Sequence, residues 1–353
     1  MSAPSGFRPR RSASWRGCSS RTGAGNGAAL TGVRESAFAK VNLCLFLGPS
    51  RADGRHRLLT LFESVQLVDE LLITPLPSGA DQVVCPGVTG PNLVTEALAG
   101  LRAAGWSAPP VLVRIEKRIP VAAGMGGGSA DAAAMLRCAG RVGSLPSAAV
   151  ARIAAGLGAD VPGQLDPGLS LGTGAGERIA PVADLAEHRL LVLPDPFGLS
   201  TAEVYREADR LRLSRAAREL ESLQAELEGA LAPAGGAARL PARLLVNDLA
   251  PAAISLRPEI ATALELARAA GAEPALVCGS GPTVIGIFSG RESSRRAHRA
   301  ADRLRGRYPA AVAVEPVRRR GPVAVEPVRG GVPAPAPNEP AEGSRRRRRT
   351  SDR

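Results

Sequence analysis

The segment from residue 120 to residue 130, Pro-Val-Ala-Ala-Gly-Met-Gly-Gly-Gly-Ser-Ala, constrains this chain more than any other part of its sequence. Residues 111–119 before it alternate as a strand does, and the alanine-rich residues 130–138 after it predict a helix. Glycines let a backbone approach a bulky anion, and the start of a helix offers unpaired N–H groups and the positive end of the helix dipole. The segment therefore predicts a loop that binds a phosphate chain.

This loop differs from the two most familiar glycine-rich phosphate loops. It has no Gly-x-x-x-x-Gly-Lys-Ser/Thr pattern, which excludes a Walker A loop. Ser129 stands where Gly-x-Gly-x-x-Gly requires its last glycine, which argues against a dinucleotide-binding fold. A flexible hinge between strand and helix is the alternative interpretation of a glycine cluster taken by itself.

The net charge of +12 belongs to the two ends of the chain. Residues 1–34 and 318–353 carry +6 each, so the part between them is neutral. The basic ends, including the arginine run 345–349, are read as solvated and disordered, and nucleic-acid binding by the folded part is not expected. Of the 45 basic residues only Lys40 and Lys117 are lysines, which suggests that these positions need a compact ammonium group.

The cysteines and the apolar segments indicate the cellular compartment in which the protein works. The five cysteines are scattered and form no Cys-x-x-Cys pair, so neither a disulfide framework nor a zinc site is expected. The sequence contains no run of 18 apolar residues, so no membrane span is predicted. The Arg- and Ser-rich N-terminus is read as an extension on a cytoplasmic bacterial protein, with an organelle transit peptide as the alternative.

The length of 353 residues suits two domains. We expect a disordered basic extension at 1–33, a first domain at 34–180, a second at 181–317 and a disordered tail at 318–353. Strands are expected at 39–47, 58–67, 70–75, 187–194 and 310–317, with helices at 92–101, 147–156, 201–229, 258–270 and 294–305.

The glycine loop resembles that of the GHMP kinases, the small-molecule kinases that include galactokinase, homoserine kinase, mevalonate kinase and phosphomevalonate kinase. Their pattern is Pro-x-x-x-Gly-Leu-Gly-Gly-Gly-Ser-Ser/Ala, and Met125 replaces the leucine here at nearly constant volume. Residues 39–43 with the turn 53–56, residues 157–162 and residues 279–283 resemble the branch that acts on a cytidine diphosphate-linked methylerythritol. The likeness spans about residues 34–317.

The resemblance implies an α+β, two-domain GHMP-kinase fold. Its N-terminal domain would be like domain 2 of ribosomal protein S5, its C-terminal domain ferredoxin-like, and its site would lie between them. ATP is the implied phosphate donor, with Mg²⁺ bridging phosphate oxygens near Ser129 or Glu116 and no dedicated protein metal site. The residues implied at the nucleotide are Pro120, Val121, Ala122, Ala123, Gly124, Met125, Gly126, Gly127, Gly128, Ser129 and Ala130.

The resemblance assigns the catalytic pair to Lys40 and Asp160. An Asp beside an alcohol can accept its proton, and a nearby Lys keeps that Asp ionised and favours the developing alkoxide. Taken singly, Asp160 also suits a turn before Pro162, and Lys40 also suits a surface strand edge.

The substrate contacts are implied in the same way. His56 matches a histidine that meets the cytidine base, and Tyr205 matches an aromatic position that stacks on it. Arg55 and Arg57 replace the family's Tyr and Glu, which puts base affinity in question, although an arginine plane also stacks on bases. The implied substrate residues are Asn42, His56, Thr201, Tyr205, Gly279, Ser280 and Gly281.

The expected activity is therefore ATP-dependent phosphorylation of the 2-hydroxyl of 4-diphosphocytidyl-2-C-methyl-D-erythritol, in non-mevalonate isoprenoid biosynthesis, by a monomer or homodimer. One alternative is another GHMP kinase of the homoserine or mevalonate type. The other is a catalytically inactive paralogue that binds nucleic acid through its basic ends.

Overall fold

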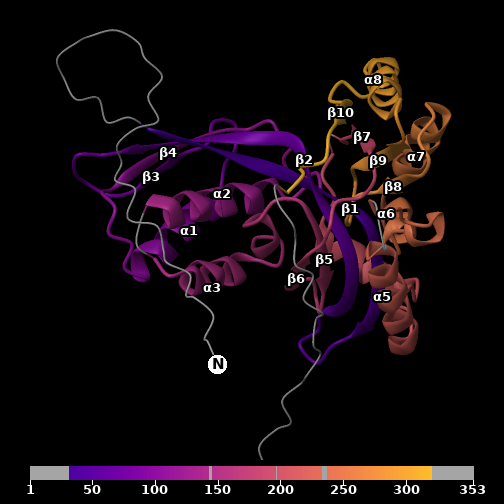
Figure 1. Cartoon of the computed structure of the whole chain (residues 1–353), viewed down its shortest axis with the longest axis horizontal. Coiled ribbons are helices and arrows are strands. Elements are labelled where there is room, and N and C mark those ends of the chain that lie inside the picture. The colour runs from indigo at the N-terminus through magenta and orange to yellow at the C-terminus, as the bar shows by residue number, and fades with distance from the viewer. Residues whose placement is uncertain (1–31, 143–144, 196, 233–236, 320–353) are drawn as a thin grey trace, which may run out of the picture.

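Figure 1 shows the computed structural model, in which two sheets and their helices are joined by one long hairpin. The residues that the structure describes are 32–142, 145–195, 197–232 and 237–319. The ends that composition predicts to be disordered lie almost wholly outside the described residues.

The long hairpin consists of β1 (Val33–Ser50) and β2 (His56–Pro75), which pair antiparallel. The first sheet has the order β3-β4-β2-β5-β6, with β1 also paired to β2. Its other strands are β3 (Gln82–Val84), β4 (Val111–Glu116), β5 (Leu169–Thr173) and β6 (Arg178–Pro181). The helices α1 (Leu93–Ala103), α2 (Gly127–Val142) and α3 (Ser147–Leu157) lie together beside this sheet (Figure 1).

The second sheet is antiparallel and has the order β10-β7-β9-β8. Its strands are β7 (His188–Leu193), β8 (Ala275–Val277), β9 (Val284–Ser289) and β10 (Val312–Val314). The remaining helices are α4 (Thr201–Arg210), α5 (Ala217–Leu231), α6 (Ala250–Leu256), α7 (Glu259–Ala269) and α8 (Ser293–Leu304). The expected α+β class is confirmed.

Three expected elements are joined or divided in the structure. The strands expected at 58–67 and 70–75 form the single strand β2, because a bulge opposite Phe38 and Ala39 absorbs Gln66 and Leu67 without ending the pairing. The helix expected at 201–229 is two helices, since the chain turns at Arg212, whose φ is +57°, before α5 begins. Neither break has a glycine or proline that would mark it in the sequence.

The hairpin also connects the two halves of the molecule. Leu45 and Leu47 of β1 belong to the buried cluster that packs around the second sheet. After β10 the chain returns to the first sheet, where the Gln66 amide donates to the Glu315 carbonyl and the Val317 amide to the Ser64 carbonyl, each at 2.8 Å. The sheets thus share packing, and the domain boundary at 180/181 remains a prediction.

Candidate active site

The glycine loop is anchored between β1 and the start of α2. The Lys40 amide donates to the Met125 carbonyl at 3.0 Å, and α2 begins at Gly127, earlier than the residues 130–138 expected from sequence. Gly124 and Gly126 have φ values of +74° and +68°. A Cβ on Gly124 would lie 2.8 Å from the Gly281 carbonyl oxygen, so a side chain at this point is excluded.

A cavity of about 420 Å³ opens on the outer side of the loop. Every position from Pro120 to Ser129 lines it, together with Asn92 and Lys117. Asn92 caps α1 by accepting a hydrogen bond from the Val94 amide at 2.9 Å. With the N-terminus of the sixteen-residue α2 in its wall, this cavity suits a polyphosphate.

A buried charge cluster lies below this loop, and sequence reasoning missed its two acids. Lys117 Nζ donates to Asp69 Oδ2 at 2.5 Å and to Asp131 Oδ2 at 2.8 Å, and Asp69 is fully buried. Burial, which the Lys117 charge only partly offsets, raises the pKa of Asp131 to about 7. The scarcity of lysine was the only sequence signal for this cluster.

A second cavity, of about 330 Å³, lies on the inner side of the loop. It contains the two residues predicted as a catalytic pair: Lys40 Nζ is 3.7 Å from Asp160 Oδ2. The Lys40 side chain is 10% exposed and that of Asp160 49%, so the ammonium is embedded in the wall while the carboxylate faces the open space. β1 supplies Lys40, and the turn after α3 supplies Asp160.

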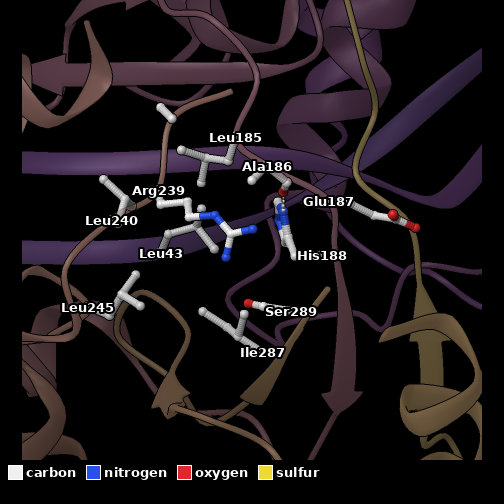
Figure 2. A pocket seen from close by; sticks show the side chains of 11 residues that line it. Leu43, Leu185, Ala186, Glu187, His188, Arg239, Leu240, Leu245, Ile287 and Ser289 are labelled. Carbon is white, nitrogen blue, oxygen red and sulfur yellow. Dashed lines mark hydrogen bonds between the residues drawn. The ribbon is translucent and has the colours of Figure 1, made fainter. Parts of the chain in front are cut away.

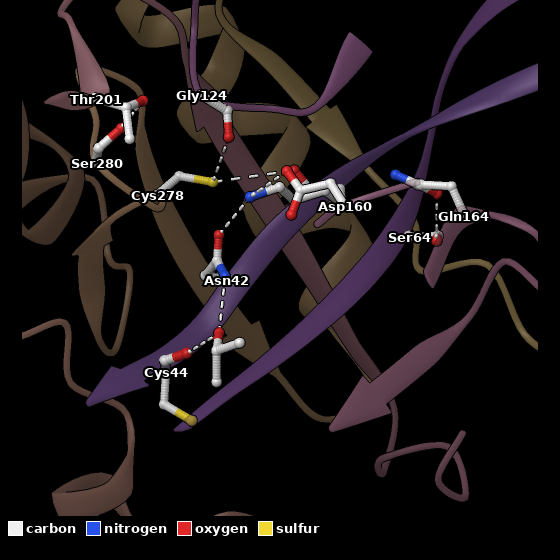
Figure 3. Close-up of polar contacts among 11 residues, drawn as sticks. Asn42, Cys44, Ser64, Gly124, Asp160, Gln164, Thr201, Cys278 and Ser280 are labelled. Atoms are coloured by element: carbon white, nitrogen blue, oxygen red, sulfur yellow. Dashed lines mark hydrogen bonds and ion pairs between the residues drawn. The ribbon is translucent and has the colours of Figure 1, made fainter. Parts of the chain in front are cut away.

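Lys40 is held by a line of hydrogen bonds along the hairpin, which Figure 3 shows. Lys40 Nζ donates to Asn42 Oδ1 at 2.9 Å, and Asn42 Nδ2 donates to Thr60 Oγ1 at 2.8 Å. The Thr60 hydroxyl in turn donates to the Cys44 carbonyl at 2.7 Å. Lys40, Asn42 and Thr60 are all buried, and all three line the inner cavity.

The two cavities share one wall. Gly124, Gly126 and Ser129 line both of them. A Cβ on Gly126 would lie 3.1 Å from Lys40 Cγ and 3.7 Å from Asp160 Oδ2. At this point of the wall only the glycine backbone therefore stands between the charged pair and the outer cavity. A phosphate chain on the outer side and an acceptor on the inner side would therefore meet across this backbone.

Comparison with known proteins places the chain in a family. Residues 92–168 match the GHMP kinases N terminal domain, and residues 217–310 match GHMP kinases C terminal. A Streptomyces coelicolor protein named 4-diphosphocytidyl-2-C-methyl-D-erythritol kinase is 44% identical over 265 residues, covering 72% of this chain and 87% of that protein. The chain belongs to the GHMP kinase family.

Other relatives agree with this assignment. A Thermobifida fusca protein of the same name is 41% identical, covering 75% of this chain and 90% of its own length. A crystal structure of 4-(cytidine 5'-diphospho)-2C-methyl-D-erythritol kinase has a TM-score of 0.63 at 31% identity, covering 80% of this chain and 98% of that one. A homoserine kinase from Cytophaga hutchinsonii, at TM-score 0.61 and 16% identity, shares the fold. The expected two-domain GHMP-kinase fold is confirmed, and the chain is a small-molecule kinase.

The structure brings together most of the residues that the GHMP resemblance assigned to the acceptor. Thr201, Tyr205, Gly279 and Ser280 line the inner cavity, and the hydroxyl groups of Thr201 and Ser280 are hydrogen-bonded to each other at 2.9 Å. Gly281 lies behind them, with its carbonyl against the glycine loop. This side of the cavity comes from α4 and from the turn between β8 and β9.

Asn247, which lies just before α6, holds that turn in place. Its Nδ2 donates to the carbonyls of Val277 and Gly279 at 2.7 Å each, and its Oδ1 accepts from the Leu249 amide at 2.9 Å. Both donor hydrogens of this buried amide are therefore directed at the backbone around the β8–β9 turn.

Of the two residues expected to meet the base, Tyr205 lines the inner cavity and His56 does not. His56 is buried with protein partners on both ring nitrogens: Nδ1 lies 2.9 Å from the Gly48 carbonyl and Nε2 3.0 Å from Asp209 Oδ1. It reaches the inner cavity through Tyr205, whose ring centroid is 5.8 Å from its own. A direct bond from His56 to a base remains a prediction. Arg55 pairs with Asp53 at 3.2 Å in the exposed turn.

Glu116, named as a candidate metal neighbour, lies elsewhere. It is exposed at the end of β4, pairs with Arg118 at 2.9 Å and does not line either cavity. Within the described ranges, no three His, Cys, Asp or Glu side chains gather as a metal cage, and none of the four described cysteines forms a disulfide. No helix in the described part of the chain is long and apolar enough to cross a membrane.

A smaller cavity, of about 170 Å³, lies near the opposite face of β1, and Figure 2 shows it. Leu43 lines this cavity, whereas its neighbour Asn42 lines the inner cavity. His188 also lines it and bridges the two sheets: Nε2 lies 2.8 Å from Glu63 Oε2, and Nδ1 2.8 Å from the Ala186 carbonyl. This buried pair joins β7 to β2.

The His188–Glu63 pair predicts a stability that depends on pH. Burial lowers the pKa of His188, but the hydrogen bond and charge of Glu63 raise it by more, so that its pKa lies above its ordinary value. The stabilisation is therefore complete below the ordinary imidazole pKa of about 6.5 and declines as pH rises through the folded pKa. We expect His188→Gln to lower the free energy of unfolding by about 1–3 kcal/mol at pH 5.5 and by less at pH 9.

Urea unfolding of the wild type and of His188→Gln across that pH range measures this effect. The quantity to follow is the difference between the two proteins, because other groups that titrate contribute to both curves alike. A difference that stays constant from pH 5.5 to pH 9 contradicts the charged pair and leaves a pH-independent hydrogen bond in its place.

Proposed function

We propose that this chain transfers the γ-phosphoryl group of ATP to the 2-hydroxyl of 4-diphosphocytidyl-2-C-methyl-D-erythritol. The observation that carries the proposal is the Lys40–Asp160 pair, at 3.7 Å, on the inner side of a glycine loop whose outer side forms the nucleotide cavity. The choice of acceptor rests on relatives of that name, which match most of the chain at 37–44% identity.

In this proposal Asp160 receives the proton of the acceptor hydroxyl. Its half-exposed carboxylate faces the inner cavity, where an alcohol would enter. The Lys40 ammonium, 3.7 Å from that carboxylate, stabilises the alkoxide as it forms. Because phosphoryl transfer depends mainly on positioning and charge stabilisation, the main contribution of the hairpin is to hold Lys40 at the edge of the phosphate loop, facing Asp160.

The outer cavity holds the nucleotide in this proposal. The backbone N–H groups of residues 126–129 and the dipole of α2 act on the phosphates, while the charge of Lys117 at the wall is balanced by Asp69 and Asp131. GHMP kinases use ATP, generally with Mg²⁺. Mg²⁺ usually keeps several waters and binds through substrate phosphates, so the Ser129 hydroxyl, which faces both cavities, is the protein group that fits it. The ion supplies neutralisation of phosphate charge.

The acceptor lies in the inner cavity, between the hairpin and the turn that Asn247 holds. Asn42, Thr201 and Ser280 offer hydroxyl and amide groups to the polyol end. Tyr205 offers an aromatic face to the base, backed by the ring of His56.

An acceptor panel tests the proposal. The purified full chain is assayed with ATP and Mg²⁺ against the cytidyl compound, homoserine and mevalonate, with ADP release and product mass as readouts. Turnover of the cytidyl compound alone is expected. Turnover of homoserine or mevalonate without the cytidyl compound would assign the chain to another acceptor class of the family.

A shortened chain tests whether the basic ends take part. A variant limited to residues 32–319 keeps every residue that lines the two cavities, so we expect it to retain the kcat of the full chain within about twofold. Circular dichroism and thermal unfolding of both forms provide the control for folding. Loss of turnover in a folded shortened chain would instead support a role for the ends in function.

A further inference from the structure

Thr60 was not among the residues predicted for the site, yet it lies at the centre of its polar network. It stands on β2 opposite Leu45 of β1, and its hydroxyl connects the Asn42 amide to the Cys44 carbonyl (Figure 3). Thr60 is 7% exposed. It lines the inner cavity and not the nucleotide cavity.

Every hydrogen bond in the line from Cys44 to Lys40 has only one direction available. The Cys44 carbonyl can only accept, so the Thr60 hydroxyl donates its single proton there. The Thr60 oxygen must then accept from Asn42, which turns Nδ2 of that amide towards Thr60 and Oδ1 towards Lys40. An ammonium group can only donate, so Oδ1 is the end of the amide that it requires.

From these directions we propose that Thr60 is a positioning residue: it fixes the orientation of the Asn42 amide, which in turn holds the Lys40 ammonium beside Asp160. The inference deepens the proposed function and depends on it for the role of Lys40. Without the threonine hydroxyl, Asn42 Nδ2 has no acceptor at this end, and a flipped amide would present its NH₂ group to the ammonium. Two donors would then face each other, and Lys40 would move away from the shared wall.

The backbone explains how the hairpin places these groups in line. Lys40 and Asn42 are two residues apart and point to the same face of β1. The register shifts between Asn42 and Cys44, which leaves Leu43 without a partner in the pairing. The bulge brings Leu45, opposite Thr60, onto the cavity face as well. Thr60 therefore stands directly behind Asn42 although 18 residues separate them in sequence.

The test compares Thr60→Val, which keeps the shape and removes the hydroxyl, with Thr60→Ser, which keeps the hydroxyl. We expect Thr60→Val to lower kcat by about 10-fold or more while KM for ATP changes by less than about twofold, because a small displacement of a catalytic group acts on the chemical step. Thr60→Ser should restore kcat to within about threefold of the wild type. Ser293→Ala, which removes a fully buried hydroxyl at the start of α8, is the matched control and should leave kcat unchanged.

A spectroscopic readout follows the amide itself. The chain has only five asparagines, so selective ¹⁵N labelling of asparagine gives a side-chain spectrum that single substitutions can assign. We expect the Asn42 NH₂ resonances to shift in Thr60→Val and to return in Thr60→Ser. Thermal unfolding of each variant checks that it is folded.

The outcomes separate this proposal from the proposed function. Wild-type kcat in Thr60→Val, Asn42 resonances that do not move, or a Thr60→Ser variant as impaired as Thr60→Val would each overturn the positioning role. A wild type that phosphorylates no acceptor in the panel, but whose Asn42 resonances respond as expected, supports the hydrogen-bond line and counts only against the proposed function.

Discussion

Asp160→Asn is expected to lower kcat by about 10²-fold or more while ATP still binds. The amide has nearly the shape of the carboxylate but cannot accept a proton from the acceptor hydroxyl. The side chain is 49% exposed and lines only the inner cavity, so the substitution disturbs neither a buried core nor the nucleotide cavity. The loss should therefore appear in kcat and in kcat/KM for the acceptor.

Steady-state kinetics with the cytidyl acceptor, together with ATP binding by calorimetry, measure the two parts of this expectation. Asp166→Asn is the matched control, because that exposed carboxylate pairs with Arg319 and lines neither cavity. Near-normal turnover of Asp160→Asn would remove Asp160 from the mechanism.

Lys40→Arg is expected to have an effect of similar size, about 10²-fold on kcat, although it keeps the positive charge. The Lys40 stem packs against Gly126, where an added Cβ would already lie 3.1 Å from Cγ, and Nζ lies 3.6 Å from the corresponding point on Gly279. A planar guanidinium does not fit between these two glycines while remaining hydrogen-bonded to Asn42. The composition points the same way, since this arginine-rich chain keeps a lysine here.

The control for this variant is Arg114→Lys, a change between the same two residues at an exposed position on β4. It should leave kcat and the unfolding temperature unchanged. If Lys40→Arg keeps full activity, a compact ammonium is not required, and the retention of lysine at this position has no catalytic cause.

The sequence was sufficient for those features that are local. The glycine loop, its preceding strand and its following helix are specified by adjacent residues, and the structure places them as predicted, with α2 beginning three residues earlier than expected. The low helix propensity of Gly127 and Gly128 explains that difference, because the anchored loop supplies the first turn that propensity disfavours. Lys40 and Asp160 were paired only through the family resemblance, and the structure places them 3.7 Å apart.

Features that depend on strand register could not be read from the sequence. Asp69 meets Lys117 because β2 pairs with β4, and Thr60 meets Asn42 because of the bulge in β1. In both cases residues far apart in the chain are aligned by pairing whose register no local pattern specifies. The full burial of His56 was also missed, because its turn reads as an exposed segment and the covering residue, Asp209, comes from a helix more than 150 positions away.

The extra residue in β1 has a consequence for how this strand can vary. Asn42 and Leu45 lie on the same face of the strand because Leu43 is an extra residue between them. Leu43 itself lies on the other face, where it lines the smaller cavity. Because Leu43 has no partner in the pairing, loss of this one residue would leave Cys44 opposite Leu61 and Leu45 opposite Thr60, as in a regular strand. Such a deletion would keep Asn42 and Leu45 on the inner cavity and would remove only the side chain that lines the smaller cavity on the other face.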